Sequence, residues 1–513
     1  MTFAEFIRAH ETDDPVRLLL SRDKFPDIDL DLAVTTLEVR RRLRTKVPEW
    51  YAVPSLLYPS RLSGEQCSSS DTARYKALVA ESLFSESLFS ELLVSGGGGI
   101  PKPSLRDPSQ NGFWAPPSYA PEGGHRFGDP TAPGNPDDIN ASCHSGQSTS
   151  CHSERSSFCH SERSPFCHSE RSEGISRIAD LTGGMGVDAW AFAQVAGEVL
   201  YNEMQTELAK ATELNFKELG VGNMRFRNEV VEPGKVKEVL DGFEPDVIYL
   251  DPARRAEDGK KVFLIEDCRP DVLGLLPELF AASRFVLLKL SPMADITMAC
   301  KRLGHVREVH VVASGGECKE LLFVLERAWE GDYTVFVVEG GSVMEIPGQA
   351  GNDGEKQPEN DGNGKVGKDG SASLVISTGA KRNGEIYLFE PGKALAKAGA
   401  FNLPCTRFGL TKLATHTHLY VGETMPEGLA PFGKWFEIID LLPLNNRNLK
   451  EVGKRYPQAE VTARNIPMTS DLLRKKTGCA SGGDVHLFGI RADAVADPGN
   501  YLIICKRIGY GKD

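Results

Sequence analysis

Apolar residues recur every three or four positions through residues 1–93, most clearly in DLDLAVTTLEVRRRLRTKVPEWY and SSSDTARYKALVAESLF. This period is typical of helices that bury one face. Pro54 and Pro59 separate the two segments, as turn residues do. We therefore expect an N-terminal region that is mainly helical.

Between residues 175 and 346 the pattern changes to short apolar runs that alternate with helical segments, which is the signature of a doubly wound parallel sheet. The predicted strands are Ile178–Leu181, Val199–Glu203, Met224–Asn228, Val247–Asp251, Phe285–Leu290, Val309–Ser314 and Leu321–Glu326. The last two are joined by about six residues, GGECKE, which is too short for a parallel crossover. The pattern thus predicts an antiparallel strand at the end of a parallel sheet.

Two stretches carry too few apolar residues to build a core. In residues 94–174 about ten of 81 residues are large and apolar, so we expect a disordered insertion. This stretch contains a repeat with a period of eight residues, CHSGQSTS, CHSERSSF, CHSERSPF and CHSERS. Each His directly follows its Cys, which does not match the spacing of zinc ligands, so the repeat indicates a low-complexity segment. Residues 347–373 are glycine-rich and predict a flexible linker or loop insertion. The chain after residue 374 mixes strand runs, SLVIST, IYLFE and YLIICK, with short helical segments, as small α+β units do.

Composition narrows the class of protein. Hydrophobic residues make up 40% and charged residues 25%, and no run approaches the roughly 20 apolar residues that cross a bilayer. The N-terminus lacks the basic and apolar segments of a secretory signal, so we expect a cytoplasmic protein. Four of the 11 cysteines lie in the octad repeat, and the other seven are scattered as reduced thiols would be.

The net charge of −12 is unevenly distributed. Residues 373–513 contain 19 Lys and Arg against 13 Asp and Glu, a net charge of +6, which leaves −18 for the rest. The basic end predicts an anionic partner, although ordinary solubilising charge explains it equally well.

The segment IADLTGGMGVDAWAFA carries the strongest candidate site. A strand ends in a turn with Gly183, Gly184 and Gly186, and a helix begins near Val187. Glycine lets the backbone approach a ligand closely, and a helix N-terminus favours polar or anionic groups. Such turns also use glycine for purely structural reasons. The next strand ends in Glu203, where a carboxylate is placed to bind ribose hydroxyls or, alternatively, to cap the following helix.

Two classes of cofactor are bound by a strand, a glycine turn, a helix and a second strand that ends in an acidic residue. They are dinucleotides and S-adenosylmethionine. The turn DLTGGMG lacks the GxGxxG spacing that binds a pyrophosphate. Asp180 would repel phosphate, whereas it would hold an ammonium such as the methionyl amine of S-adenosylmethionine. The antiparallel last strand favours the same cofactor.

At these residues the chain resembles class I S-adenosylmethionine-dependent methyltransferases. The resemblance implies a cofactor site made of Asp180, Gly183, Gly184, Gly186 and Glu203, with Asn228 or Glu229 beside the adenine. The fourth strand ends in DPAR, similar to the [DN]PP[YFW] motif of enzymes that methylate base amino groups. That similarity implies Asp251, Pro252 and Arg254 as catalytic residues. Ala253 and Arg254 depart from the motif, which leaves the target atom open.

The whole chain also resembles a bacterial family of methyltransferase-like proteins that end in a ferredoxin-like unit and a THUMP-like domain. The motifs are QCSSSDTARYKA, LKLSPM, GGECKELLF, FGLTKLATHTHLYV and ARNIPMTSDLLRKKTG. The resemblance implies a methyltransferase domain at 175–346, a ferredoxin-like unit at 374–430 and a THUMP-like domain at 431–513, with RNA as the substrate. Arg464, Asn465, Arg474, Lys475 and Lys476 form a basic tract that would contact phosphates, unless they are only a solvated helix end.

Other residues point to chemistry less directly. Lys289, Ser291 and Pro292 follow the fifth strand and would face the same crevice. His416 and His418 have the spacing of a metal-binding pair on a strand but lack a third ligand nearby, so we expect no obligatory metal. Cys268 and Cys318 suit packing better than nucleophilic catalysis.

The sequence therefore predicts an α/β methyltransferase with a Rossmann-like sheet that binds S-adenosylmethionine and modifies a base nitrogen of RNA. Two alternatives stay open. One is a non-catalytic RNA-binding protein on a methyltransferase scaffold, and the other is a methyltransferase for a protein or small molecule.

Overall fold

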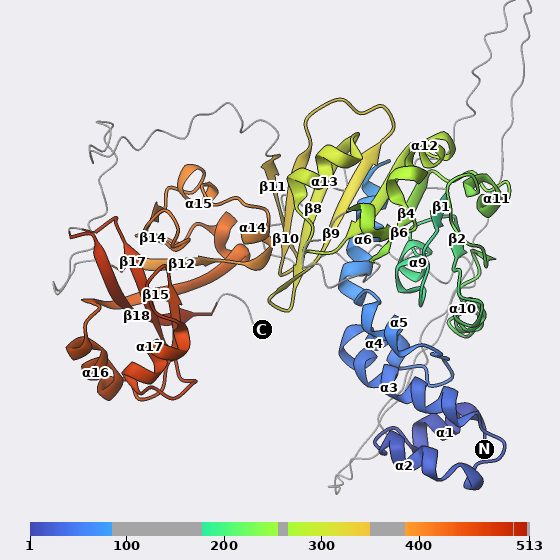
Figure 1. The fold of residues 1–513 in the computed structure, drawn as a ribbon, viewed down its shortest axis with the longest axis horizontal. Helices are drawn as coiled ribbons and strands as arrows, with labels where there is room; N and C mark the ends of the chain where they lie inside the picture. The colour runs from blue at the N-terminus through green and yellow to red at the C-terminus, as the bar shows by residue number, and fades with distance from the viewer. Residues whose placement is uncertain (85–176, 255–264, 349–384, 496, 510–513) are drawn as a thin grey trace, which may run out of the picture.

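The structure, a computed structural model, describes residues 1–84, 177–254, 265–348, 385–495 and 497–509. Figure 1 shows three parts along the chain, which are blue helices, a green-to-yellow sheet and an orange-to-red sheet. The predicted insertion at 94–174 lies outside the described residues, and so does the predicted linker apart from Pro347 and Gly348.

The N-terminal part is mainly helical, as its periodicity predicts. Side-chain caps start its two longest helices: the Asp29 carboxylate accepts a hydrogen bond from the Leu32 N–H, and Ser69 and Thr72 form a capping box. None of the described helices is long and apolar enough to cross a membrane. The elements are α1 (Phe3–Ala9), α2 (Pro15–Leu20), η1 (Arg22–Lys24), α3 (Leu30–Lys46), α4 (Pro48–Tyr51), α5 (Arg61–Gln66) and α6 (Ser70–Ser82).

Nine strands form the central sheet in the order β11-β10-β8-β9-β7-β4-β1-β2-β3. Strands β3, β2, β1, β4 and β7 run parallel to one another. The strands are β1 (Arg177–Asp180), β2 (Glu198–Asn202), β3 (Met224–Arg227), β4 (Val247–Leu250), β7 (Phe285–Leu290), β8 (Val306–Ser314), β9 (Glu317–Glu326), β10 (Thr334–Glu339) and β11 (Ser342–Pro347). The helices that follow them are α9 (Val187–Phe192), α10 (Thr206–Glu218), α11 (Val236–Leu240), α12 (Val272–Ala282) and α13 (Ile296–Leu303). The chain runs from β1 to β2 and β3 on one side and to β4 and β7 on the other. Ligands of such sheets bind at this reversal, at the carboxyl ends of the strands.

The predicted antiparallel strand is confirmed. Strand β9 runs antiparallel to both β7 and β8. Gly315 and Gly316 form the turn between β8 and β9 with φ angles of 60° and 77°, a conformation that tight hairpins need and glycine adopts readily. The strand is inserted between β7 and β8 and so does not form the sheet's edge, and β10 and β11 extend the sheet further beyond β8.

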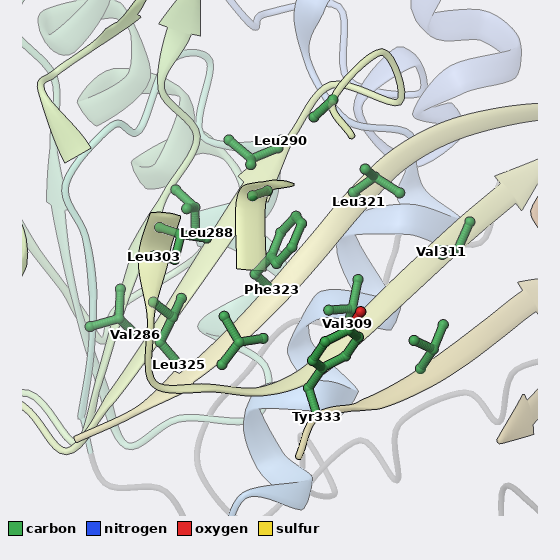
Figure 2. Packing of buried hydrophobic residues seen from close by; sticks show 14 of the residues in the cluster. Val286, Leu288, Leu290, Leu303, Val309, Val311, Leu321, Phe323, Leu325 and Tyr333 are labelled. Carbon is green, nitrogen blue, oxygen red and sulfur yellow. The ribbon is translucent and has the colours of Figure 1, made fainter. Parts of the chain in front are cut away.

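Alternating side chains divide the core of the sheet into two faces. Figure 2 shows Val286, Leu288, Phe323 and Leu325 packed together on one face. That face is covered by α11, α12 and α13. The intervening residues pack on the other face with α9, α10 and the N-terminal helices. The N-terminal region is therefore part of the same hydrophobic core as the sheet.

A second sheet of seven strands forms the C-terminal part, in the order β13-β14-β12-β15-β18-β17-β16. Helix α14 (Lys393–Lys397) packs against β8, β9 and β10, and Lys397 Nζ donates to the Ala294 carbonyl at 2.8 Å. The remaining elements are β12 (Tyr387–Pro391), α15 (Leu403–Thr406), β13 (Thr411–Lys412), β14 (Tyr420–Gly422), η4 (Glu427–Phe432), β15 (Gly433–Pro443), α16 (Asn446–Arg455), β16 (Glu460–Arg464), α17 (Ser470–Thr477), β17 (Val485–Ala492) and β18 (Gly499–Ile508).

Candidate functional site

The glycine turn after β1 is tightly built. A Cβ on Gly183 would lie 2.1 Å from the Tyr201 ring, and one on Gly186 would lie 2.8 Å from Thr212. Gly184 and Gly186 have φ angles of 54° and 87°, which disfavour other residues. The Tyr201 hydroxyl donates to the Gly184 carbonyl at 2.5 Å. Strand β2 therefore fixes the path of the turn.

A cavity of about 700 Å³ opens beside this turn, at the carboxyl ends of β1, β2 and β4. Five predicted site residues line it, namely Gly183, Gly184, Gly186, Glu203 and Asp251. Asp180, Asn228 and Pro252 are not among the lining residues. Residue 254 belongs to a two-residue strand, β5 (Ala253–Arg254), that pairs with β6 (Cys268–Arg269).

The N-terminal region supplies one wall of the cavity. Its lining residues are Ser63, Gln66, Cys67 and Ser68, from the end of α5 and the turn into α6. Burial raises the pKa of the Cys67 thiol, which therefore stays protonated at neutral pH. Sequence reasoning treated this region as a separate helical unit and missed its part in the site.

The charged side chains that line the cavity are mostly acidic. They are Asp188, Glu203, Glu229, Glu232, Asp251 and Asp271, and Arg269 is the one cation among the lining residues that the structure describes. Four of these acids have basic partners outside the lining: Asp188 contacts Lys76 at 3.2 Å, Glu229 contacts Arg227 at 3.8 Å, Glu232 contacts Lys235 at 3.0 Å, and Asp251 contacts Lys289. The excess negative charge of the lining is thus carried mainly by Glu203 and Asp271. The cavity therefore favours a positively charged ligand over a pyrophosphate.

Asp180 lies directly behind the cavity wall and is 1% exposed. One carboxylate oxygen accepts from the Thr182 N–H at 3.0 Å, and the other, Oδ2, has no hydrogen-bond partner among the described residues. Burial raises the pKa of Asp180 well above its usual range, and the neighbouring Asp188 adds to the rise. A cation close to Oδ2 would stabilise the ionised form of this carboxyl.

Glu203 follows β2 and is held by two backbone groups. Its carboxylate accepts from the Gly184 N–H at 2.9 Å and from the Gln205 N–H at 2.8 Å. The second bond is to the residue before α10, and no side chain of the described residues caps α10 itself, so the capping role considered from sequence is not found. Because each carboxylate oxygen can accept a further bond, Glu203 can also bind a ligand in the cavity.

Asn228 bridges two elements instead of lining the cavity. Its Nδ2 donates to the Glu203 carbonyl at 2.6 Å, and its Oδ1 accepts from the Thr206 hydroxyl at 2.9 Å. The adjacent Glu229 and Val230 do line the cavity. Of the two residues considered for this position from sequence, Glu229 is thus the one at the cavity.

Asp251 follows β4 at the floor of the cavity. Its N–H donates to the Thr182 hydroxyl at 2.6 Å, and its carboxylate pairs with Lys289 of β7. Burial works to lower the pKa of Lys289, but Asp251, Glu320 and Asp188 together raise it well above its usual range. A permanent positive charge therefore lies beside Asp251, whose side chain is 35% exposed.

A buried ionic network lies beneath the cavity. Lys76 of α6 contacts Glu320 at 2.8 Å and Asp188 at 3.2 Å, and donates to the Ser68 hydroxyl at 3.0 Å. Asp188 also accepts from the hydroxyls of Ser68 and Tyr249, both at 2.9 Å. Burial alone would raise the pKa of Asp188, but Lys76 and Lys289 lower it below its usual value.

The predicted basic tract is only partly free. Arg464 pairs with Glu390, and Arg474 with Glu460 at 3.4 Å, whereas Lys475 and Lys476 are exposed. The neighbouring helix α16 packs on α17 and exposes further basic residues, which sequence reasoning passed over. They are Arg447, Lys450, Lys454 and Arg455.

No group of three or more metal-ligating side chains occurs among the described residues. His416 and His418 accordingly have no third ligand there. The seven scattered cysteines are all free thiols.

The sheet order and antiparallel β9 define a class I methyltransferase-like fold, followed by ferredoxin-like and THUMP-like parts. Residues 387–428 match the model of a ferredoxin-like domain, and residues 433–507 match that of a THUMP domain-like family. The chain is similar to the crystal structure of a "putative methyltransferase" from Porphyromonas gingivalis W83, with 26% identity and a TM-score of 0.65. The match covers 99% of this chain and 98% of that one.

Smaller parts of the chain match other solved structures. An rRNA methylase from Streptococcus thermophilus is 15% identical over 30% of this chain and 89% of its own, with a TM-score of 0.23. A Thermus thermophilus 16S rRNA methyltransferase, solved with its cofactor and guanosine, is 14% identical over 29% of this chain and 37% of its own, also with a TM-score of 0.23. Scores this low do not establish a relationship. No curated protein matches the chain.

Proposed function

We propose that this protein is an S-adenosylmethionine-dependent methyltransferase that modifies a base nitrogen of RNA. The acidic cavity beside the glycine turn is the observation that carries the proposal. S-adenosylmethionine has a sulfonium and an ammonium group, whereas a dinucleotide has a pyrophosphate. Because six acids and one arginine line the cavity, the first ligand fits its charge and the second does not.

The residues present suit each part of this cofactor. The unpaired Oδ2 of Asp180 lies behind the wall where an ammonium would be stabilised. Glu203 is oriented by two backbone bonds to accept ribose hydroxyls. Glu229 and Asn228 remain our candidates for the adenine side. When bound, the cofactor supplies an electrophilic methyl group.

Asp251 is the main proposed catalytic residue, and Pro252 and Arg254, which follow it in the chain, are retained as the other two candidates. The Asp251 carboxylate would accept a hydrogen bond from the target amine and then the proton that the amine loses. Lys289 holds this carboxylate in place through their ion pair. Thr182 fixes the backbone of Asp251.

RNA is the substrate class that the C-terminal part favours. The match to a THUMP-like domain and the exposed lysines and arginines of α16 and α17 support a phosphate-binding surface there. Within the acidic cavity, Arg269 is available to bind a phosphate of the same strand. RNA as substrate also implies a cytoplasmic location. The folded domains that we propose are residues 1–93, 175–346, 374–430 and 431–513.

Nucleoside mass spectrometry tests this function. RNA from cells that lack the protein would be incubated with purified protein and S-adenosylmethionine that carries a deuterated methyl group. We expect one labelled nucleoside, which the Asp251→Asn variant fails to produce. Labelling of protein or small molecules instead of RNA would support the alternative methyltransferase, and the absence of any labelled product would support the non-catalytic RNA-binding protein.

A further inference from the structure

Two C-terminal segments that the sequence singled out meet in the structure. The loop with THTH follows β13, whereas Arg464 is the last residue of β16 and Asn465 begins the loop after it. The Asn465 side chain donates to the Thr417 hydroxyl at 3.5 Å, and that hydroxyl donates to the Arg491 carbonyl at 2.7 Å. The ferredoxin-like and THUMP-like parts are thus joined at this point.

Both loops contain a residue in the left-handed backbone region. His418 has a φ of 49° and Asn465 a φ of 54°. Asparagine and histidine are both among the residues that, after glycine, adopt this conformation most often. The conformation of His418 places its ring 4.0 Å from the Phe401 ring, centroid to centroid.

Two cations and two imidazoles gather here, namely Lys412, Arg464, His416 and His418. Lys412 Nζ lies 5.8 Å from the centroid of the same Phe401 ring, on which a cation is favoured. The charged groups that act on His418 are Lys412, His416 and Arg464. Burial lowers the pKa of His418, and these three neighbours lower it further. An anion bound among them would relieve their mutual repulsion.

Within the part of the chain that the structure describes, two buried nitrogen atoms of the cluster have no hydrogen-bond partner. They are Nδ1 of His418 and Nε of Arg464, although Glu390 holds another nitrogen of Arg464. An imidazole and a guanidinium are donors that suit phosphate oxygens. A metal ion is a poorer match, because no third metal-ligating side chain joins the two histidines among the described residues.

We propose that Lys412, His416, His418 and Arg464 form a phosphate-binding site that holds the RNA strand at the junction of the ferredoxin-like and THUMP-like parts. The site rests on the proposed function in that its ligand is a phosphate of the RNA substrate. It is separate from the lysines of α16 and α17, and it assigns a binding role to the THTH segment. Phe401 provides an apolar ring beside it on which a base can stack.

The test uses the full-length protein and a fluorescein-labelled 20-nucleotide single-stranded RNA of mixed sequence, with binding followed by anisotropy from low to high salt. We expect the double variant Lys412→Gln/His416→Ala to bind at least about tenfold more weakly, because one ammonium contact and one imidazole contact are lost. The dependence of affinity on salt should also become shallower by about one phosphate contact. Lys412→Arg should retain most of the affinity.

Lys24→Gln is the matched control, because Lys24 is an exposed lysine of the N-terminal region. Its RNA affinity should equal that of the wild type. Thermal unfolding and cofactor binding of the double variant should stay unchanged, which separates a lost contact from a lost fold. Inorganic phosphate added at equal ionic strength distinguishes a general anion site from one that needs the RNA strand, since only the former is emptied by millimolar phosphate.

Two outcomes overturn the proposal in different ways. If the double variant binds RNA with wild-type affinity and salt dependence, the junction is not a phosphate site, while RNA as the substrate class stands. If the wild-type protein itself fails to bind the RNA at low salt, both the junction site and the RNA substrate are wrong.

Discussion

Lys76 on helix α6 bonds both carboxylate oxygens of Glu320 on strand β9, at 2.8 and 2.9 Å, across 244 residues of sequence. Both side chains are almost fully buried. This ion pair connects the N-terminal helices to the antiparallel strand of the sheet, beneath the cavity. The wall formed by α5 and α6 is therefore part of the site's rigid frame.

Lys76→Met should destabilise the protein by about 3–5 kcal/mol, because it leaves Glu320 and Asp188 buried without their cation. Chemical denaturation measures the loss. The double variant Lys76→Met/Glu320→Gln should recover part of it. Lys210→Met, which removes an exposed lysine of α10, should leave stability unchanged. A Lys76→Met variant as stable as the wild type would show that the network contributes little.

Gly183→Ala should disrupt the turn, since the new Cβ would lie 2.1 Å from the Tyr201 ring. We expect a loss of about 1–3 kcal/mol in stability and a sharp drop in cofactor affinity. In the double variant Gly183→Ala/Tyr201→Leu, a shorter side chain replaces the ring that the new Cβ would meet. This variant should lose less stability than the sum of the losses in the two single variants. Simple additivity of the two effects would argue against the proposed clash.

Asp251→Asn keeps the shape of the side chain but removes its negative charge. If Asp251 takes a proton from the target amine, turnover should fall by about 10²–10⁴-fold while cofactor affinity changes little. Steady-state methylation and calorimetry measure the two effects separately. Wild-type turnover in this variant would make Asp251 a structural residue only.

Arg269→Gln tests the cation of the cavity. Its loss should raise KM for RNA by about tenfold and leave cofactor affinity and kcat nearly unchanged, because the guanidinium would contact substrate phosphate. Arg269→Lys should be intermediate, since lysine keeps the charge and loses the bidentate geometry. An unchanged KM in Arg269→Gln would place the substrate path elsewhere.

The sequence was most informative where strand ends carry chemistry. Glu203 and Asp251 follow apolar runs, and the carboxyl ends of neighbouring parallel strands meet at one edge, so their convergence on the glycine turn was predictable. Strands β10 and β11 were missed although the sequence signals them: TVFVVE and SVMEIP are apolar runs joined by Gly340 and Gly341, as in a hairpin. What the sequence does not show is that this hairpin pairs with β8.

The contacts that complete the site were less accessible from sequence. Lys76 and Ser68 reach the cavity region only through packing between helices and sheet that are far apart in the chain. Arg269 reaches it through the pairing of two-residue strands β5 and β6, which are too short to show a period. Charge counts found the basic C-terminal region, but only the structure shows that Arg464 and Arg474 are paired with carboxylates.

Isothermal titration calorimetry with S-adenosylmethionine and S-adenosylhomocysteine tests the central claim most directly. We predict saturable binding of both to the wild-type protein at a one-to-one ratio, with affinity lost in Glu203→Ala, and no heat with NAD. The folded state of each sample would be verified by thermal unfolding, whose midpoint should rise with cofactor concentration. Absence of binding at millimolar cofactor, or binding of NAD in its place, would contradict the assignment of this cavity to a methyltransferase.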